Sequence, residues 1–382
     1  MKKHINRSLI ILVLVFLSAC KQEDNRTANK TSEIASTDNL KTKFNSEVVV
    51  SDLDIPWGFT FLPDKSMLIT EKLGDLIHVK DGVKTKISGL PEVKVQGQGG
   101  LLDIELHPKY EQNGFIYITY ASSDGEGKGA NTTLIRCKLE GTNLVDVKRL
   151  YKATPNSKKG QHFGSRIEFD NDGYLYFSVG DRGNRDENPQ DITRDCGKVY
   201  RLNDDGSIPE SNPFVNNPNA KQAIFSYGHR NIQGMAKHPE TGDIWTHEHG
   251  PRGGDEINIS KSGINYGWPL ASYGVNYSGT KFTDNTSLPN MKDPMHHWTP
   301  SIAPSGMTFV TSDIYPSLKG HLLVGSLKFQ YVNICYLKNN SVAKEERILE
   351  GIGRVRSMRQ GPDGYIYVGV ENVGIVKLLP SK

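Results

Sequence analysis

The chain has 382 residues, of which 36% are hydrophobic and 23% charged, and its formal net charge is only +3. This length allows a large buried core, and the 38 glycines and 19 prolines indicate many turns. The weak net charge and the lack of a basic block argue against a nucleic-acid partner.

The N-terminus has the composition of an export signal. A charged start, Met1–His4, precedes an apolar run from Leu9 to Leu17 that is too short to span a bilayer. The run ends in Leu17-Ser18-Ala19-Cys20, which resembles the lipobox of bacterial lipoproteins. We therefore expect residues 1–19 to be a cleaved signal peptide and Cys20 to be lipidated, with an ordinary signal peptide as the alternative. Lys21 after the cysteine indicates the periplasmic face of the outer membrane.

Residues 20–43 form a second segment, polar and almost free of apolar residues, which we interpret as a disordered tether. Residues 44–382 are then the folded domain. Its cysteines, Cys137, Cys196 and Cys335, allow at most one disulfide and match no zinc motif, so a hydrophobic core must supply the stability.

A short strand, a polar turn and a second strand recur six times in the folded part. Each copy is typical of a β-hairpin. The copies cover residues 58–70, 102–118, 166–177, 234–246, 306–324 and 357–368.

This repeat predicts an all-β protein, a six-bladed β-propeller with one hairpin in each four-stranded blade. We expect Glu47–Val50 to pair with Gly374–Leu378 and close the ring, which hides two strand edges. A β-sandwich with long loops is the competing architecture, but the regular recurrence disfavours it.

The repeat also predicts where the functional side chains meet. In an antiparallel hairpin the start of the first strand and the end of the second lie at the same rim, so residues at these points should converge on one mouth of the central channel. Those residues are Gln98, His162, Arg166, Asp181, Arg230, Asn231, Gly250, Pro251, Lys328, Arg354 and Arg356.

Two kinds of chemistry follow from this set. His162 is a candidate general base, and Asp181 is a candidate for the acid that orients it. The cationic members have few acids beside them and would repel one another unless an anion such as a planar polycarboxylate lay among them. Tyr277 and Trp298 could stack on such a ring.

Taken alone, the stretch Glu248–Tyr277 is best interpreted as a glycine-rich turn followed by a strand, with Asp255 and Glu256 solvated. Its oxygen-rich composition also suits a calcium site. The carbonyls of Gly250 and Pro251 are oxygen donors of the kind that Ca²⁺ takes. The histidine pairs His247/His249 and His296/His297 could indicate zinc, but no third ligand stands at a diagnostic spacing.

Several motifs together resemble the soluble quinoprotein glucose dehydrogenases, most closely the bacterial aldose sugar dehydrogenases. The resemblance covers nearly everything after the tether, and GPRGGDEIN is its most specific part. The motifs are QGQGGLLDIELHP (96–108), HFGSR (162–166), GHRNIQGM (228–235), EHGPRGGDEINI (248–259), NYGWPLASYGVNYSG (265–279) and RVRSMRQGPDGYIYV (354–368).

The resemblance implies a propeller that carries pyrroloquinoline quinone (PQQ) and Ca²⁺ and oxidises the C1 hydroxyl of aldose sugars to lactones. His162 would be the base, Asp181 would orient it, and Arg230 would stabilise the charge that develops on the quinone. Carbonyls of Gly250 and Pro251 would hold the cofactor's calcium, and the Glu256 side chain with the Tyr266 carbonyl would hold a second, structural calcium. The implied cofactor contacts are Gln98, Arg230, Asn231, Tyr277, Lys328, Arg354 and Arg356.

Two other functions remain open at this stage. A calcium-dependent sugar lactonase needs a carboxylate-rich metal pocket, and a non-catalytic binding propeller should have lost the histidine or the arginines. We expect a monomer that touches the membrane only through its lipid anchor and passes electrons to a quinone or a cytochrome. The preferred sugar cannot be read from the sequence.

Overall fold

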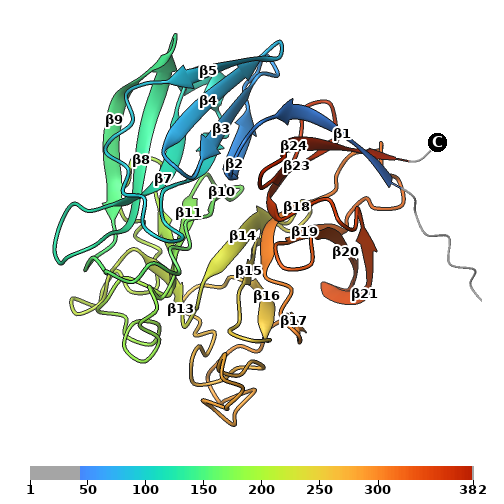
Figure 1. The fold of residues 1–382 in the computed structure, drawn as a ribbon. Coiled ribbons are helices and arrows are strands. Elements are labelled where there is room, and N and C mark those ends of the chain that lie inside the picture. The colour runs from blue at the N-terminus through green and yellow to red at the C-terminus, as the bar shows by residue number, and fades with distance from the viewer. Residues whose placement is uncertain (1–43, 381–382) are drawn as a thin grey trace, which may run out of the picture. The chain divides into compact units, whose positions relative to one another are not determined.

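A computed structural model describes residues 44–380, and these form six four-stranded antiparallel sheets. The sheets are the blades of a six-bladed β-propeller (Figure 1), which confirms the predicted fold. The predictions for the signal peptide, Cys20 and the tether fall outside the described residues.

Each blade is numbered here in chain order, and its strands are given from the inside outward. Blades 1 to 3 consist of β2 (Pro56–Phe61), β3 (Met67–Glu71), β4 (Asp75–Lys80) and β5 (Val83–Ile87); β6 (Leu101–Leu106), β7 (Ile116–Ser122), β8 (Asn131–Glu140) and β9 (Asn143–Lys152); and β10 (Ile167–Phe169), β11 (Leu175–Val179), β12 (Lys198–Leu202) and β13 (Ile224–Tyr227). Blades 4 to 6 consist of β14 (Ile232–Lys237), β15 (Ile244–Glu248), β16 (Asp255–Ile259) and β17 (His296–Trp298); β18 (Pro304–Phe309), β19 (Leu322–Ser326), β20 (Tyr331–Lys338) and β21 (Ser341–Ile348); and β22 (Val355–Gln360), β23 (Ile366–Val370), β24 (Gly374–Pro380) and β1 (Phe44–Ser51). All six predicted hairpins are the two inner strands of a blade.

The last blade closes the ring as predicted. Strand β1 pairs antiparallel with β24, and Glu47 lies opposite Lys377. In Figure 1 the blue start of the described chain therefore lies beside its dark red end. Because this pairing joins the two ends of the described chain, blade 6 becomes a complete four-stranded sheet.

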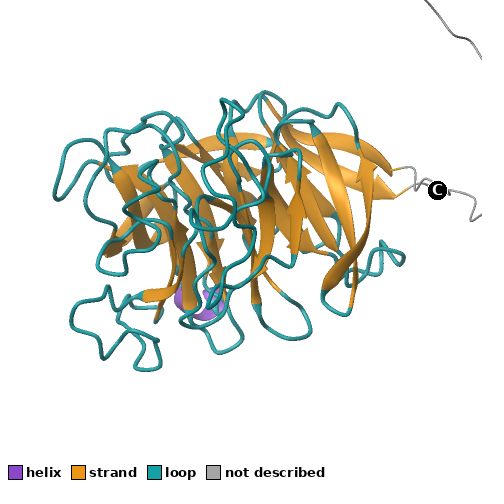
Figure 2. Ribbon diagram, turned by 90° about the horizontal axis from the view of Figure 1, so that it is seen from below, coloured by secondary structure: helices purple, strands orange, loops and turns teal. Residues whose placement is uncertain are grey.

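Strands account for nearly all regular structure in the described chain (Figure 2), and one short helix, α1 (Tyr110–Asn113), interrupts them. Among residues 44–380 no helix is long and apolar enough to cross a membrane. The three cysteines of this part, Cys137, Cys196 and Cys335, are buried free thiols.

The hydrophobic core lies between the faces of neighbouring blades. One cluster, for example, joins Leu68 and Leu76 of blade 1 to Ile104 and Ile118 of blade 2. Inner strands have a neighbour on each face, so β11 is buried at every position. The outer strands β5 and β21 are largely exposed, as expected for edges that face water.

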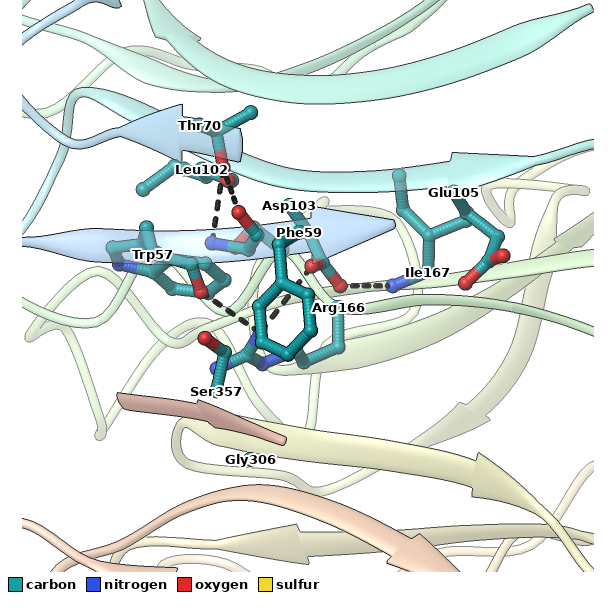
Figure 3. A network of polar contacts seen from close by, with 12 residues as sticks. Trp57, Phe59, Thr70, Leu102, Asp103, Glu105, Arg166, Ile167, Gly306 and Ser357 are labelled. Atoms are coloured by element: carbon teal, nitrogen blue, oxygen red, sulfur yellow. Dashed lines mark hydrogen bonds and ion pairs between the residues drawn. The ribbon is translucent and has the colours of Figure 1, made fainter. Parts of the chain in front are cut away.

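Arg166 lies near the channel axis and contacts four other blades. Its guanidinium donates to the carbonyls of Trp57 at 3.2 Å, Gln233 at 2.7 Å and Arg356 at 2.6 Å, and to the Asp103 carboxylate at 3.3 Å. Figure 3 shows the contacts with Trp57 and Asp103. It is only 5% exposed. The prediction that Arg166 lies at the mouth beside His162 is therefore wrong, because its side chain turns inward along the axis and ties blades together.

Candidate functional site

A histidine and a carboxylate meet at one mouth of the channel. His162 precedes β10 and Asp181 follows β11, so the hairpin between them brings both to the same rim. The His162 Nδ1 and Asp181 Oδ1 atoms are 2.6 Å apart, and the two side chains are 12% and 1% exposed. His162 has a left-handed backbone with φ of 59°, a conformation that is uncommon for non-glycine residues and often found at functional sites.

Two further donors fix the Asp181 carboxylate. Trp268 Nε1 donates to its Oδ2 at 2.9 Å, and the Gly183 amide donates to its Oδ1 at 2.7 Å. Burial opposes the charge on Asp181, but the hydrogen bond and charge of His162, the charge of Arg230 and the Gly183 amide together outweigh burial, so the pKa of Asp181 lies below its usual value. The carboxylate is therefore ionised and locked in place. Trp268 is a site residue that the sequence analysis missed.

His162 is held as a neutral imidazole near neutral pH. Burial lowers the pKa of His162; the hydrogen bond to Asp181 opposes this shift, and the charge of Arg230 adds to it. With Asp181 ionised, Nδ1 carries the proton that is donated to Asp181, and Nε2 keeps a free lone pair. The pair can therefore accept a proton at Nε2.

A small cavity of about 240 Å³ lies against this pair. It is lined mostly by polar side chains, with two aromatic rings. The lining residues are Lys159, Gln161, His162, Asp181, Gly183, Asn184, Arg185, Asp186, Arg230, Pro251, Trp268, Asn276 and Tyr277. Its size and polarity suit a small hydroxylated molecule rather than an apolar one.

A large cavity of about 670 Å³ adjoins the small one, and both are lined by Pro251 and Tyr277. Of the residues implied by the resemblance it contains Gln98, Asn231, Pro251, Tyr277, Lys328, Arg354 and Arg356. Trp57 and Phe163 supply aromatic surface to it. The predicted convergence at one mouth thus brings the implied cofactor contacts around one space, except Arg230, which lines the small cavity. Trp298 is not among its lining residues, because its Nε1 donates to Glu345 between blades 4 and 5.

The charges around the large cavity differ from the prediction in one respect. Glu371 pairs with both Arg354, at 2.6 Å, and Arg356. This carboxylate is 8% exposed, and although burial opposes its charge, the charge of Arg356 and the hydrogen bonds of both arginines hold its pKa below the usual value. The expectation of few acids beside the arginines overlooked it. Positive side chains in the lining of the large cavity still outnumber the single carboxylate, Glu371. They are Lys72, Arg252, Lys328, Arg354 and Arg356.

Arg230 lies beside the turn that begins at Gly250. Its guanidinium donates to the carbonyls of His249 at 3.0 Å and Gly250 at 3.1 Å, and lies 5.3 Å from the centre of the Trp268 ring. Because the side chain lines the small cavity near His162, it can stabilise negative charge that forms where the two cavities meet.

The Asp255 carboxylate fixes the turn at Gly250–Gly254 through hydrogen bonds. This buried carboxylate accepts from the Gly250 amide at 2.8 Å and from Ser301, Ile302 and Ala303 in the segment between β17 and β18. A Cβ on Gly250 would lie 2.0 Å from the Gly253 carbonyl oxygen, so the turn requires glycine there. The result is a tight, carbonyl-rich turn at the edge of the large cavity, and its donors fit a hard cation such as Ca²⁺.

A second oxygen-rich position lies around Glu256, which is opposite Glu248 in the β15–β16 pairing. Burial and the charge of Glu248 raise the pKa of Glu256 well above its usual value. Asn258 Nδ2 donates to Glu256, whereas the buried Asn258 Oδ1 has no partner. Both oxygens of Glu248 already have partners, His229 Nδ1 and the Arg230 amide. The Glu256 carboxylate and the unpartnered Asn258 amide oxygen are therefore the groups here that fit a divalent cation.

The histidine pairs do not converge on a metal. His247 Nε2 pairs with the Gly306 carbonyl and His249 Nε2 with the Pro304 carbonyl, at 3.2 and 2.8 Å. His296 pairs with Glu345, and His297 stacks on Tyr273. Within residues 44–380 no three His, Cys, Asp or Glu side chains gather as a metal site.

Fold and site together define a β-propeller of the sugar dehydrogenase class. The chain belongs to the family described as Glucose / Sorbosone dehydrogenase, whose profile matches residues 53–377.

Individual proteins agree with this assignment. Aldose sugar dehydrogenase YliI of Escherichia coli (strain K12) is 41% identical over 331 residues, which cover 85% of this chain and 89% of that protein. The apo-form crystal structure of the soluble aldose sugar dehydrogenase from Escherichia coli has a TM-score of 0.85 at 39% identity, covering 89% of this chain and 100% of that one. The PQQ-bound aldose sugar dehydrogenase from Streptomyces coelicolor has a TM-score of 0.71 at 26% identity, covering 89% and 99%.

Proposed function

We propose that this protein oxidises the C1 hydroxyl of aldose sugars to lactones, with PQQ as the hydride acceptor and Ca²⁺ as its partner. The observation that carries the proposal is the His162–Asp181 pair in a small polar cavity that adjoins a large cationic one. The similarity to aldose sugar dehydrogenases, one of them solved in a PQQ-bound form, supports it.

The large cavity fits a planar tricarboxylate. Arg354 and Arg356 present guanidinium groups that are pre-oriented by Glu371, and Lys328 adds an ammonium group. Guanidinium forks match carboxylates in geometry and charge. Gln98, Asn231 and Tyr277 line the same cavity as neutral partners for the ring and its carbonyls.

In the small cavity the sugar would lie with its C1 hydroxyl toward His162 Nε2. His162 would accept the hydroxyl proton, and Asp181 would stabilise the imidazolium that results. Trp268 and Gly183 keep Asp181 from turning during this transfer. A correctly placed base of this kind contributes about 10²–10⁴-fold to the rate.

When bound, PQQ supplies a carbon that accepts the hydride, and Ca²⁺ supplies a Lewis acid next to its carbonyl. Carbonyls of Gly250 and Pro251 would hold this calcium, and the Arg230 guanidinium beside them would stabilise the charge that develops there. A structural calcium at Glu256 and the Tyr266 carbonyl is a second part of the proposal.

The lactonase alternative is disfavoured because the large cavity is cationic rather than rich in carboxylates. The binding-protein alternative is disfavoured because His162, Asp181 and the arginines are all in place. The lipid anchor at Cys20, the location at the outer membrane, the monomeric state and the quinone or cytochrome acceptor stay predictions from the sequence.

Reduction of a redox dye by aldoses tests the proposal. The purified protein should reduce the dye with glucose only after PQQ and Ca²⁺ are added, and chelation of Ca²⁺ should abolish the activity. Lactone hydrolysis without PQQ would favour the lactonase, and an inert protein that still binds sugar would favour the binding propeller.

A further inference from the structure

One cation of the large cavity has no role among the contacts that the resemblance implies. Lys72 lines this cavity from blade 1, where it directly follows β3. Ile55 and Trp57 of the same blade line the cavity with it. All the implied contacts, from Gln98 onward, come after the last strand of blade 1 in the chain. Lys72 is therefore an unassigned positive group on the wall of the proposed cofactor site.

The main chain and the base of the Lys72 side chain are held in place. The Lys72 amide donates to the Ile55 carbonyl at 3.1 Å, and the Lys72 carbonyl accepts from the Leu101 amide at 3.0 Å. Gly100 packs so closely that a Cβ there would lie 1.9 Å from the Lys72 carbonyl oxygen and 3.0 Å from its Cγ. A half-buried lysine with a fixed base loses less conformational freedom when its ammonium group binds a ligand.

Electrostatic interactions connect the Lys72 ammonium group with the arginine pair of blade 6. Burial lowers the pKa of Lys72, the charge of Arg356 lowers it further, and the charge of Glu371 opposes both. The oxygens of Glu371 accept from Arg354 and Arg356, so this carboxylate acts on Lys72 through its charge alone. Lys72 and the two arginines thus belong to one positive cluster around a single carboxylate, and an anion in the cavity would stabilise all three.

The neighbouring acid, Glu71, is engaged elsewhere. Its Oε2 accepts from the amides of Asp54 and Ile55 at 3.0 and 3.2 Å, and its Oε1 is buried without a hydrogen-bond partner. Burial raises the pKa of Glu71. Glu71 therefore fixes the segment before β2 and does not hold the Lys72 ammonium group.

The position of blade 1 in the ring indicates which part of a ligand Lys72 meets. In a ring of six, blade 1 lies opposite blade 4, as β2–β5 and β14–β17 show (Figure 1). The Gly250–Gly254 turn joins β15 and β16 of blade 4, and its Pro251 lines the large cavity. Lys72 and this turn therefore line the cavity from opposite blades. A planar anion that a cation holds at the turn has its far edge toward Lys72.

We propose that Lys72 is a further cofactor-binding residue, which donates to a carboxylate of the planar polycarboxylate on the side of the large cavity opposite the calcium turn. The identity of this anion rests on the proposed function. A charge-assisted hydrogen bond from an ammonium group is of the same kind as the bond expected from Lys328. Lys72 does not line the small cavity, so it acts on cofactor affinity and not on the removal of the sugar's proton.

Fluorescence titration of the purified full-length protein with PQQ, in the presence of Ca²⁺, tests this contact. Lys72→Met keeps an unbranched side chain and removes the charge, so PQQ should bind roughly tenfold or more weakly. Lys72→Arg keeps the charge and should bind PQQ more tightly than Lys72→Met. Lys84→Met is the matched control on β5 of the same blade, because Lys84 Nζ donates to the Ser51 and Asp52 carbonyls, outside the large cavity.

Two further measurements separate a charge contact from a structural effect. PQQ affinity should fall less steeply with added salt in Lys72→Met than in the wild type, because one charge is missing. A crystal of the PQQ complex should show Lys72 Nζ within hydrogen-bond distance of a cofactor carboxylate. Equal PQQ affinity in wild type and Lys72→Met, or a Lys72 ammonium group that points to solvent in the complex, would overturn the contact and leave the proposed function standing. A wild-type protein that binds no PQQ would overturn both.

Discussion

At the residue scale, the site depends on the protonation states of His162 and Asp181, which burial and their mutual hydrogen bond determine. Burial favours neutral forms of both groups, and their hydrogen bond favours the ion pair. The balance leaves the pKa of His162 below its usual value of 6.5 and Asp181 ionised. A base of this kind works at neutral pH without first losing a proton.

The pH dependence of turnover follows from this balance. His162 is active when neutral, so kcat/KM should fall only as the pH drops through a pKa below 6.5. Asp181→Asn removes the group that raises the pKa of His162, so the acid limb should move to lower pH while the plateau falls by about 10²–10⁴-fold. The measurement is a pH–rate profile of both proteins.

Asp204→Asn is the control for this profile, because Asp204 pairs with the remote His107 at 3.4 Å and its loss should leave the limb in place. The account is contradicted if the kcat/KM of the wild type already falls above pH 6.5, or if the fall in kcat/KM moves to higher pH in Asp181→Asn.

Arg354 provides a separate test of the large cavity. Its side chain is 45% exposed and pairs with Glu371, so Arg354→Ala should fold normally. Loss of a charge-assisted hydrogen bond, worth about 1.5–3 kcal/mol, should weaken PQQ binding by roughly 10- to 100-fold and leave the KM for sugar nearly unchanged. Fluorescence titration with PQQ measures the first quantity and steady-state kinetics the second.

Arg347→Ala is the matched control for Arg354→Ala, since Arg347 lies over Tyr331 on blade 5, outside the large cavity. Equal losses of PQQ and sugar affinity in Arg354→Ala would argue against a cofactor contact.

At the element scale, the turn at Gly250–Gly254 joins the β15–β16 hairpin to the mouth. Gly250→Ala would place a Cβ 2.0 Å from the Gly253 oxygen and force the turn open. The expected cost is about 1–3 kcal/mol in the free energy of unfolding, with a Ca²⁺ affinity at least tenfold weaker. Urea denaturation and calcium titration measure the two effects.

Gly320→Ala is the control for this turn, because a Cβ there meets nothing within 4 Å, although its φ of 81° carries some strain. It should cost some stability and leave calcium binding unchanged. Normal calcium affinity in Gly250→Ala would remove the turn from the proposed site.

The hairpins explain how much of the site was predictable. Their alternating strands are a local signal, so the six blades and the rim that holds His162, Asp181 and Arg354 could be inferred. The same rule, applied to the residue directly after β23, points to Glu371, and that signal was overlooked. Trp268 lies in a long loop between β16 and β17 without periodicity, so only the tertiary structure shows that it contacts Asp181.

At the scale of the whole molecule, Arg166 links blade 3 to four other blades through the axis. Arg166→Met leaves Asp103 buried without its ion pair and removes the Arg166 hydrogen bonds to three carbonyls, of which that of Arg356 still accepts from Ser305 Oγ. The expected loss is about 3–5 kcal/mol in the free energy of unfolding, measured by chemical denaturation.

Asp103→Leu combined with Arg166→Met should recover part of that loss, because no unpaired charge remains. Arg149→Met is the control, since its ion pair with Asp124 at 3.5 Å is exposed and should contribute less than about 1 kcal/mol. A loss of similar size in both single variants would show that the axial network adds no special stability.

The central claim is that His162 removes a proton while a sugar reduces the quinone bound in the large cavity. Absorption spectra of the protein reconstituted with PQQ and Ca²⁺, recorded before and after glucose is added, test it most directly. The account predicts that glucose bleaches the oxidised-cofactor band in the wild type, whereas His162→Ala binds the cofactor with the same spectrum and is not bleached on the same timescale. Bleaching of His162→Ala at the wild-type rate, or a wild-type spectrum that glucose leaves unchanged, would contradict it.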